Sequence, residues 1–157
     1  MRCIVTGGAG FLGSHLCESL LARGHNVCVV DDLFRGRKAN MEDCKGMPDF
    51  HFVLGDCADI EKLEKAEEKL HGVDVVYHLA AINGTRYFNE RPDLVIKVNI
   101  RTTDTVVKFA SERGARLVFP SSPEAYGIQN EMPLQEEDLA ICPSPHHHLR
   151  HSYGASK

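Results

Sequence analysis

The sequence predicts an α/β fold, a doubly wound parallel β-sheet with helices on both of its faces. Short apolar runs alternate along the chain with segments of helical periodicity, the order typical of a parallel sheet with right-handed crossovers. The run NVCVVD, residues 26–31, has the apolar interior that a strand buried on both faces requires. Most of the distinctive motifs directly follow these runs, where the carboxyl ends of parallel strands bind ligands.

Five apolar runs are expected to be strands: residues 2–6, 26–31, 51–56, 73–80 and 115–122. Three segments are expected to be helices: residues 11–24, 60–71 and 94–112, the last preceded by Pro92. The apolar stripes expected on the first two helices are Leu12, Leu16, Leu20 and Leu21, then Ile60, Leu63, Ala66 and Leu70. Residues 123–151 are expected to form a loop. No repeat or linker divides the chain, so we expect one domain.

Composition excludes several classes of protein. The 157 residues, 43% apolar and 25% charged, are typical of a globular domain with a single core. The net charge of −4 argues against nucleic acid or an anionic membrane as partner. No apolar run is as long as a membrane span, and the N-terminus lacks the features of a secretory signal. The six cysteines include no Cys-x-x-Cys pair, so we expect a reduced, cytoplasmic protein.

The stretch TGGAGFLGSH, residues 6–15, places three glycines at a spacing of three, Gly7, Gly10 and Gly13, directly after the first strand. Gly7 permits a tight turn, Gly10 lets a phosphate approach the backbone, and Gly13 lets the helix pack closely on the strand. A pyrophosphate would then bind the N–H groups of the helix N-terminus, where the helix dipole also favours it. The alternative is a glycine turn that binds no ligand.

An acidic pair, Asp31 and Asp32, ends the second strand. An acidic side chain at this place accepts hydrogen bonds from an adenosine ribose and repels a 2′-phosphate, which favours NAD over NADP. Arg35, Arg37 and Lys38 follow and could reach such a phosphate. With Asp31 present, we favour the interpretation of a solvated basic loop.

A second motif, YGASK, places Tyr153 four residues before Lys157. On a helix the two side chains would share a face, and the ammonium would lower the pKa of the phenol toward that of a general base. A pair of hydroxyls, Ser121 and Ser122, ends the fifth strand and could bond a reacting oxygen.

Together these motifs resemble the extended short-chain dehydrogenase/reductase family, and more narrowly its NAD-dependent nucleotide-sugar epimerases (UDP-glucose 4-epimerase-like), dehydratases and decarboxylases. The resemblance rests on TGGAGFLG, Asp31, GDCAD, HLAA, VNI, SSPEAYG and YGASK, which follow the order of the family. It implies a Rossmann-like NAD-binding domain over residues 1–157. It also implies that the domain is truncated at the Tyr-x-x-x-Lys helix, with the C-terminal substrate domain absent.

The resemblance implies NAD as the cofactor and a role for individual residues. The residues implied for the pyrophosphate are Gly7, Gly10, Phe11, Leu12 and Gly13. Those implied for the adenosine are Asp31, Asp32, Asp56 and Cys57, and those that line the cofactor elsewhere are Leu79, Ala80, Ala81 and Asn99. Ser122 would bind the sugar hydroxyl and Tyr153 would act as the base. Lys157 would hold the nicotinamide ribose, and Glu124 is a candidate second acid or base.

The activity implied is that of an epimerase that removes a hydride from the sugar C4 and passes through a 4-keto intermediate. The alternatives are a decarboxylase or dehydratase of the same family and a non-catalytic dinucleotide-binding module. Pro123 stands where dehydratases of the family tend to carry an acid, which counts against dehydration. The implied partners are a nucleotide-sugar and a second copy in a homodimer, and the 157-residue chain alone is expected to be inactive.

Four histidines, His146, His147, His148 and His151, lie close together near the end of the chain. They could chelate a metal, but no Cys or carboxylate completes a shell there, so we expect no metal site. Two side chains have an alternative without function. Asn99 could be an exposed helix residue, and Glu124 a solvated loop residue.

Overall fold

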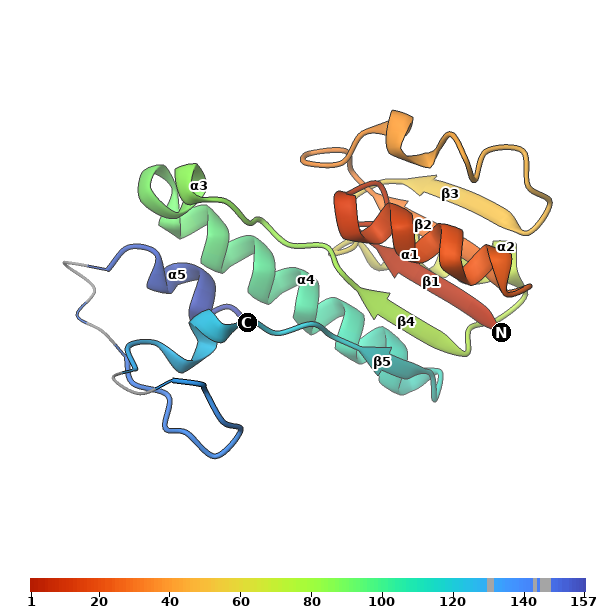
Figure 1. The fold of residues 1–157 in the computed structure, drawn as a ribbon. Coiled ribbons are helices and arrows are strands. Elements are labelled where there is room, and N and C mark those ends of the chain that lie inside the picture. Colours follow the sequence, from red (N-terminus) through yellow and green to blue (C-terminus); the bar gives the residue numbers. More distant parts are fainter. Residues whose placement is uncertain (130–131, 143, 145–147) are drawn as a thin grey trace. The chain divides into compact units, whose positions relative to one another are not determined.

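A computed structural model of the chain describes residues 1–129, 132–142, 144 and 148–157. Five strands form one parallel sheet in the order β3-β2-β1-β4-β5 (Figure 1). Their bounds are β1 Arg2–Thr6, β2 Asn26–Asp31, β3 Phe50–Leu54, β4 Val75–His78 and β5 Arg116–Val118. The doubly wound parallel sheet is therefore confirmed, although β4 and β5 are shorter than the runs 73–80 and 115–122 suggested.

The three long helices lie close to the segments predicted for them. They are α1 Phe11–Ala22, α2 Ile60–Leu70 and α4 Pro92–Glu112. The short helix α5, His151–Gly154, lies where the Tyr-x-x-x-Lys helix was predicted, but it ends before Lys157. Three other short elements were not predicted: η1 Lys38–Met41, α3 Thr85–Glu90 and η2 Pro123–Tyr126. Each of these has six residues or fewer, too few for apolar periodicity to be visible in the sequence. None of the described helices is both long and apolar enough to cross a membrane.

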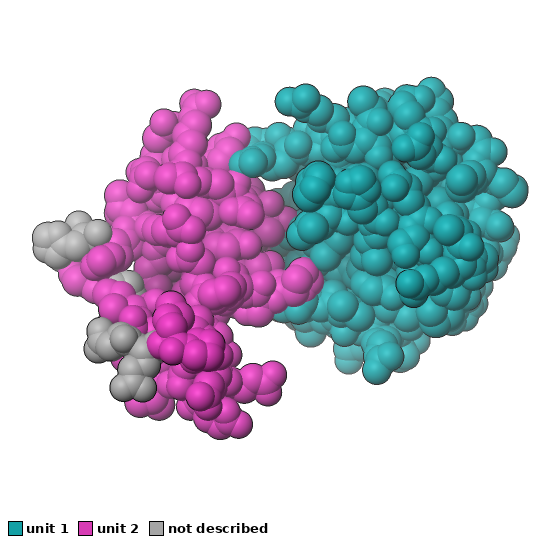
Figure 2. Space-filling view, in the orientation of Figure 1, with its two compact units in different colours: residues 1–80, 101–119 teal, residues 81–100, 120–157 magenta. Residues whose placement is uncertain are grey.

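The chain divides into two compact units (Figure 2). Unit 1 comprises residues 1–80 and 101–119 and contains the whole sheet. Unit 2 comprises residues 81–100 and 120–157, and its apolar core is formed by Ile82, Phe88 and Val95. The single domain over residues 1–157 stays a prediction.

Both faces of the sheet in unit 1 are covered by helices. Side chains of α2 and α4, such as Leu63 and Phe109, pack on one face against Ile4. Cys17 and Leu20 of α1 pack on the opposite face, on a cluster that includes the strand residues Val5 and Val29. Five of the six cysteines are buried, namely Cys3, Cys17, Cys28, Cys44 and Cys57, whereas Cys142 is exposed. Burial raises the pKa of the Cys28 and Cys57 thiols to about 12.

The apolar stripe predicted for α1 is wrong at its first position, because the Leu12 side chain is 69% exposed. The buried residues of α1 are Gly13, Ser14, Cys17 and Leu20. Close packing of Gly13 on the preceding turn sets which face of the helix points inward, and Leu12 lies outside that face. The stripe of α2 holds at Leu63, Ala66 and Leu70, but Ile60 in the first turn is 39% exposed.

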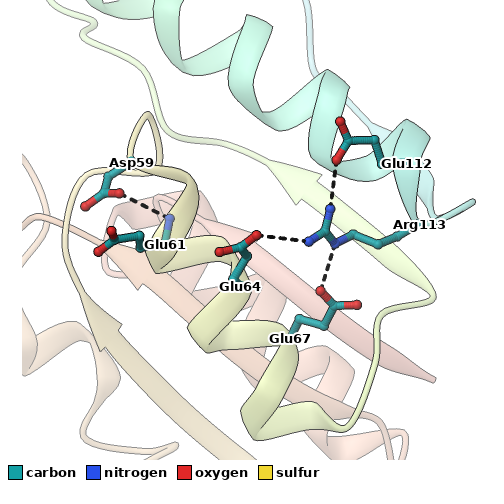
Figure 3. Close-up of polar contacts among 6 residues, drawn as sticks. All are labelled: Asp59, Glu61, Glu64, Glu67, Glu112 and Arg113. Atoms are coloured by element: carbon teal, nitrogen blue, oxygen red, sulfur yellow. Dashed lines mark hydrogen bonds and ion pairs between the residues drawn. The ribbon is translucent and has the colours of Figure 1, made fainter.

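An arginine joins α2 to the end of α4 inside unit 1 (Figure 3). Arg113 Nε donates to Glu67 Oε2 at 2.7 Å, and its Nη groups reach Glu64 at 3.4 Å and Glu112 at 3.1 Å. Its guanidinium also lies over the Phe109 ring, 4.1 Å from the ring centroid. The charged face of α2 therefore helps to hold α4 on the sheet.

Backbone packing accounts for two of the three glycines spaced three residues apart, Gly7 and Gly13. Gly7 has a φ of +71°, and a Cβ there would lie 2.7 Å from the Ala80 nitrogen. A Cβ on Gly13 would overlap the carbonyl oxygen of Gly7 and lie 2.7 Å from Gly8 Cα. Gly10 differs, since its φ is −77° and a Cβ would meet only the Gly7 oxygen, at 3.2 Å. Folding requires glycine at positions 7 and 13 far more than at position 10.

Alanine at the two helix positions should therefore have unequal effects. We expect Gly13→Ala to lower the free energy of unfolding by about 2 kcal/mol or more, since the new methyl overlaps backbone atoms that cannot move aside. We expect Gly10→Ala to lower it by less than about 1 kcal/mol, the usual cost of alanine at an N-cap. Urea unfolding of both variants measures the difference, and equal losses would contradict this account of the turn.

An ion pair fastens the start of β1 beside the start of β4. The Arg2 guanidinium donates to Asp74 Oδ1 through Nη2 at 2.5 Å and Nε at 3.2 Å, and the Arg2 backbone N–H donates to Oδ2 at 2.7 Å. These bonds lower the pKa of Asp74 to about 2.

A carboxyl whose pKa is lower in the folded state stabilises the fold above its unfolded pKa, near 4, and that stabilisation is lost as pH falls toward 2. Asp74→Asn should therefore lose less stability than the wild type between pH 4 and pH 2. Because both side chains are more than a third exposed, added salt should reduce the difference. Urea unfolding at stepwise pH provides the measurement, and parallel pH profiles would refute the role of the pair.

Candidate functional site

The carboxyl ends of the strands of unit 1 bring together most of the residues predicted to bind a cofactor. The glycine turn follows β1, and Asp31 ends β2. Asp56 follows β3, and Ala80 follows β4. These four strands are neighbours in the sheet and run in parallel, so the segments lie along one edge. Ala81 begins unit 2.

The N-terminus of α1 is suited to an anion. Its first N–H groups, at Phe11, Leu12 and Gly13, have no carbonyl partner within the helix. The N-cap Gly10 makes no side-chain capping bond, and the first turn carries no acidic residue. The space at Gly10 that a Cβ would occupy is open apart from the Gly7 oxygen. A phosphate group could thus approach donors at the positive end of the helix dipole.

Asp31 links the glycine turn to the loop that follows β2. Its Oδ2 accepts a hydrogen bond from the Ala9 N–H at 2.9 Å, and its Oδ1 accepts one from the Leu33 N–H at 2.8 Å. The residue is 7% exposed, and burial raises the pKa of its carboxyl. Leu33 has a φ of +63°, a conformation that L-residues seldom adopt. Each carboxylate oxygen keeps a second lone pair that could bind a ribose hydroxyl.

The turn after β3 carries Asp56 and Cys57. Asp56 Oδ1 accepts from the Ala58 N–H at 2.9 Å, and Oδ2 forms an ion pair with Arg101 of α4. The buried Cys57 thiol, with its raised pKa, behaves as a small apolar side chain in contact with Thr6. Sequence reasoning missed Arg101, since its distance from Asp56 along the chain gives no signal of contact.

A histidine with no role assigned from the sequence links β1 and β4. His78 is buried, with Thr6 Oγ1 2.7 Å from its Nδ1 and Thr103 Oγ1 3.3 Å from its Nε2. The Ala80 N–H donates to the same Thr6 hydroxyl at 3.3 Å, and the Leu79 N–H donates to the Thr6 carbonyl at 3.1 Å. This network fixes the backbone on which Gly7 packs. His78 is the first residue of the HLAA motif, so the sequence did contain a signal that this histidine matters.

Unit 2 contains the candidate catalytic side chains. The Tyr153 ring packs against Phe88, with centroids 5.1 Å apart, and Lys157 Nζ lies 5.9 Å from the Tyr153 ring centroid. Ser122 caps η2 by accepting from the Glu124 N–H at 3.3 Å. Glu124 Oε1 accepts from Arg150 Nε at 2.6 Å, so the glutamate is paired, and its role as an acid or base stays a prediction.

The pKa values of Tyr153 and Lys157 differ from those expected from the sequence. The helix α5 ends at Gly154, so Tyr153 and Lys157 do not share a helical face. The pKa of Tyr153 is raised, first by burial and then by the charge of Glu124. Burial lowers the pKa of Lys157. The predicted lowering of the Tyr153 pKa by Lys157 is therefore wrong, because burial of the phenol and the charge of Glu124 both disfavour the phenolate.

Asn99 is an internal tie of unit 2, and the alternative of an exposed residue is wrong, since it is 2% exposed. Its Oδ1 accepts from the Ile82 N–H at 2.7 Å, and its Nδ2 donates to Ser156 Oγ at 3.0 Å. Ser156 Oγ in turn donates to the Tyr153 carbonyl at 2.8 Å. Asn99 thus fixes the YGASK segment, and its contact with a cofactor stays a prediction.

No group of three or more potential metal ligands occurs within the described ranges. His146 and His147 lie outside those ranges.

Comparison with known proteins adds independent evidence. UDP-glucuronic acid decarboxylase 4 of Arabidopsis thaliana is 38% identical over 136 residues, which cover 87% of this chain and 29% of that protein. UDP-N-acetyl-alpha-D-glucosaminuronate decarboxylase of Bacillus cytotoxicus is 35% identical over 137 residues, which cover 87% of this chain and 41% of that protein. The chain thus spans less than half the length of these relatives.

Solved structures give the same result for the fold. A UDP-galactose 4-epimerase matches all of this chain and 48% of its own, with a TM-score of 0.79 and 34% identity. UDP-glucose-4-epimerase from Stenotrophomonas maltophila, with bound NAD and formylated UDP-arabinopyranose, matches all of this chain and 45% of its own, with a TM-score of 0.83 and 28% identity.

The sequence model of the NAD dependent epimerase/dehydratase family matches residues 3–157, which is nearly the whole chain. The glycine turn, the acidic end of β2 and the YGASK segment all lie within the matched residues. The chain belongs to the NAD dependent epimerase/dehydratase family.

Proposed function

We propose that this chain is the NAD-binding part of an enzyme that oxidises a UDP-sugar at C4 and then inverts that centre. The observation that carries the proposal is Gly10, whose φ does not demand glycine and where a Cβ would meet only the Gly7 oxygen, at 3.2 Å, at the N-terminus of α1. An approaching phosphate supplies the missing reason for glycine. The relatives named as NAD-bound and UDP-sugar enzymes support this choice of cofactor and substrate.

The residues of this chain have distinct tasks in the proposed reaction. The turn at Gly10 would bind the pyrophosphate, and Asp31 the adenosine ribose. Bound NAD would accept the hydride from the sugar. Ser122 would bond the sugar hydroxyl and Tyr153 would take its proton. Lys157 would hold the nicotinamide ribose.

Tyr153 can act as a base only if its phenolate is stabilised, and two neighbours bear on this. Glu124 opposes ionisation of the phenol, but Arg150 pairs with that carboxylate and offsets its charge. The Lys157 ammonium, whose nitrogen lies 5.9 Å from the Tyr153 ring centroid, would favour the phenolate. Catalysis near neutral pH would require this ammonium to lower the pKa of Tyr153.

Decarboxylation of a UDP-sugar acid is the second candidate reaction. The curated relatives quoted above are named as decarboxylases, and C4 oxidation would also prepare loss of a carboxylate. Glu124, held by Arg150, is a candidate acid or base for either outcome. An enzyme that contains this chain can be incubated with NAD and either UDP-glucose or UDP-glucuronic acid to distinguish the two reactions. Epimerisation converts UDP-glucose to its C4 epimer, whereas decarboxylation releases CO2 from UDP-glucuronic acid.

Cofactor preference tests the role of Asp31. We expect the chain to bind NAD at least about tenfold more tightly than NADP, since a buried carboxylate repels a 2′-phosphate. Asp31→Asn removes the charge together with one of the two backbone hydrogen bonds that Asp31 accepts, and it should narrow the preference. Gly10→Val should abolish binding of both dinucleotides. Titration calorimetry measures each affinity. Equal wild-type affinities for NAD and NADP would refute the role of Asp31 and favour the basic residues 35–38.

The proposed base gives a test of the chemistry. In an active enzyme containing this chain, Tyr153→Phe should leave NAD affinity unchanged and should lower UDP-sugar turnover by about 100-fold or more, the usual loss with a general base. Tyr126→Phe is the matched control, since Tyr126 lies in η2 and we expect it to serve packing. Full activity of Tyr153→Phe would overturn the assignment.

A further inference from the structure

Arg150 contacts two of the groups that surround Tyr153, the proposed base. Its Nε donates to Glu124 Oε1 at 2.6 Å, and its Nη2 lies 2.5 Å from the same oxygen. Its guanidinium also lies over the Phe88 ring, 5.6 Å from the ring centroid. The Phe88 ring packs in turn against the Tyr153 ring, with centroids 5.1 Å apart. The cation at the start of α5 is thus linked to Tyr153 through a carboxylate and through an aromatic ring.

The backbone of Glu124 is fixed against α5. A Cβ on Gly154 would overlap the Glu124 carbonyl oxygen and would lie 3.4 Å from the Glu124 Cβ. The Glu124 N–H also donates to the Ser122 hydroxyl at 3.3 Å. These contacts hold the Glu124 backbone beside the residue that follows Tyr153. Only the position of its carboxylate depends on a partner side chain.

The Glu124 carboxylate opposes ionisation of the Tyr153 phenol. The pKa of Tyr153 is raised, first by burial and then by this charge. The Lys157 ammonium has the opposite sign, and its Nζ lies 5.9 Å from the Tyr153 ring centroid. The repulsion between two charges depends on their separation and on whether either is paired. Loss of Arg150 would therefore leave an unpaired negative charge beside the phenol.

Other titratable and charged groups lie on α5 and on the elements packed against it. On α3, Arg86 Nε and Glu90 Oε2 form an exposed pair at 2.9 Å. From α4 comes an uncharged amide, that of Asn99. At the first position of α5, His151 Nε2 lies 3.2 Å from Cys142 Sγ. The phenols on these elements are Tyr87 of α3 and Tyr126 of η2. Among the described residues, the charge that raises the pKa of the proposed base comes from η2.

We propose that Arg150 is a positioning residue that holds the Glu124 carboxylate and the Phe88 ring in place around Tyr153. This inference rests on the proposed function, since it takes Tyr153 as the base. By pairing the carboxylate, Arg150 limits the charge that opposes loss of the phenol proton. An arginine outside the YGASK motif thus helps to set the pH at which the base works.

Titration of the Tyr153 phenol in the chain tests this proposal without NAD or a sugar. The ultraviolet absorbance of tyrosinate is followed against pH, and the signal of Tyr153→Phe is subtracted. Arg150→Met should raise the midpoint by about 0.5 pH unit or more, because the unpaired carboxylate disfavours the phenolate. Arg150→Lys should restore part of the shift, since an ammonium still pairs with Glu124 as a point charge.

Arg91→Met is the matched control. Arg91 forms an ion pair with Asp93 in the same unit, and its side chain is 56% exposed, against 58% for Arg150. The substitution removes an equally exposed pair and should leave the midpoint of Tyr153 unchanged. A shift as large as that of Arg150→Met would overturn the proposal, since any lost cation of unit 2 would then have the same effect.

Glu124→Gln shows whether the arginine acts through the carboxylate. In that variant the further change Arg150→Met should move the midpoint by less than about 0.2 pH unit, since the two side chains form one coupled pair. The same shift with and without the Glu124 carboxylate would overturn the proposal, and so would an unchanged midpoint in Arg150→Met alone.

The pH dependence of activity gives a second readout. In an active enzyme containing this chain, Arg150→Met should shift the acidic limb of the kcat/KM profile to higher pH by the same amount. UDP-sugar turnover near pH 7 should then fall about threefold, while the value at the alkaline plateau is nearly kept. Equal losses at every pH would contradict the role of Arg150. Absence of UDP-sugar turnover in the wild type would instead refute the proposed function, and the phenol titration would still decide this inference.

Discussion

The carboxyl edge of the sheet depends on two close contacts between backbone segments. Gly7 lies against Ala80 at the end of β4, and Gly13 lies against the carbonyl of Gly7. The second contact brings the first turn of α1 onto the end of β1. The hydroxyl of Thr6 and the ring of His78 hold the Ala80 backbone in place. The direction of the N–H groups of α1 follows from these contacts.

These glycine contacts also explain which features the sequence could predict and which it could not. The glycine turn and the apolar strands have local signals, because turn geometry and burial act on neighbouring residues. The exposure of Leu12 could not be predicted, since it follows from the rotation of α1 imposed by Gly13. Arg101 and Arg150 were missed for another reason. Their carboxylate partners lie 45 and 26 residues away along the chain, and charged residues are too common for such pairing to be visible.

The candidate base shows the limit of reasoning from spacing alone. A tyrosine four residues before a lysine suggests a phenol activated by an ammonium, but that argument assumes a helix and ignores desolvation. Here α5 is too short to align the two side chains, and burial shifts both pKa values against the charged forms. For Asn99 the structure adds a role that the sequence did not suggest. This residue, considered for contact with the cofactor, orders the segment that carries Tyr153.

The distribution of cysteines makes thiol reactivity a measure of whether the protein is folded. Five thiols lie in the interior, and three of them, Cys3, Cys17 and Cys28, pack among the central strands or under α1. An alkylating reagent would meet Cys142 at the surface and reach the others only after the sheet opens. Cys142, in unit 2, should therefore react quickly. The slow reaction of the buried thiols would measure the fraction of molecules in which unit 1 has unfolded. Oxidants would meet the same order of access, so damage would begin far from the glycine turn in sequence.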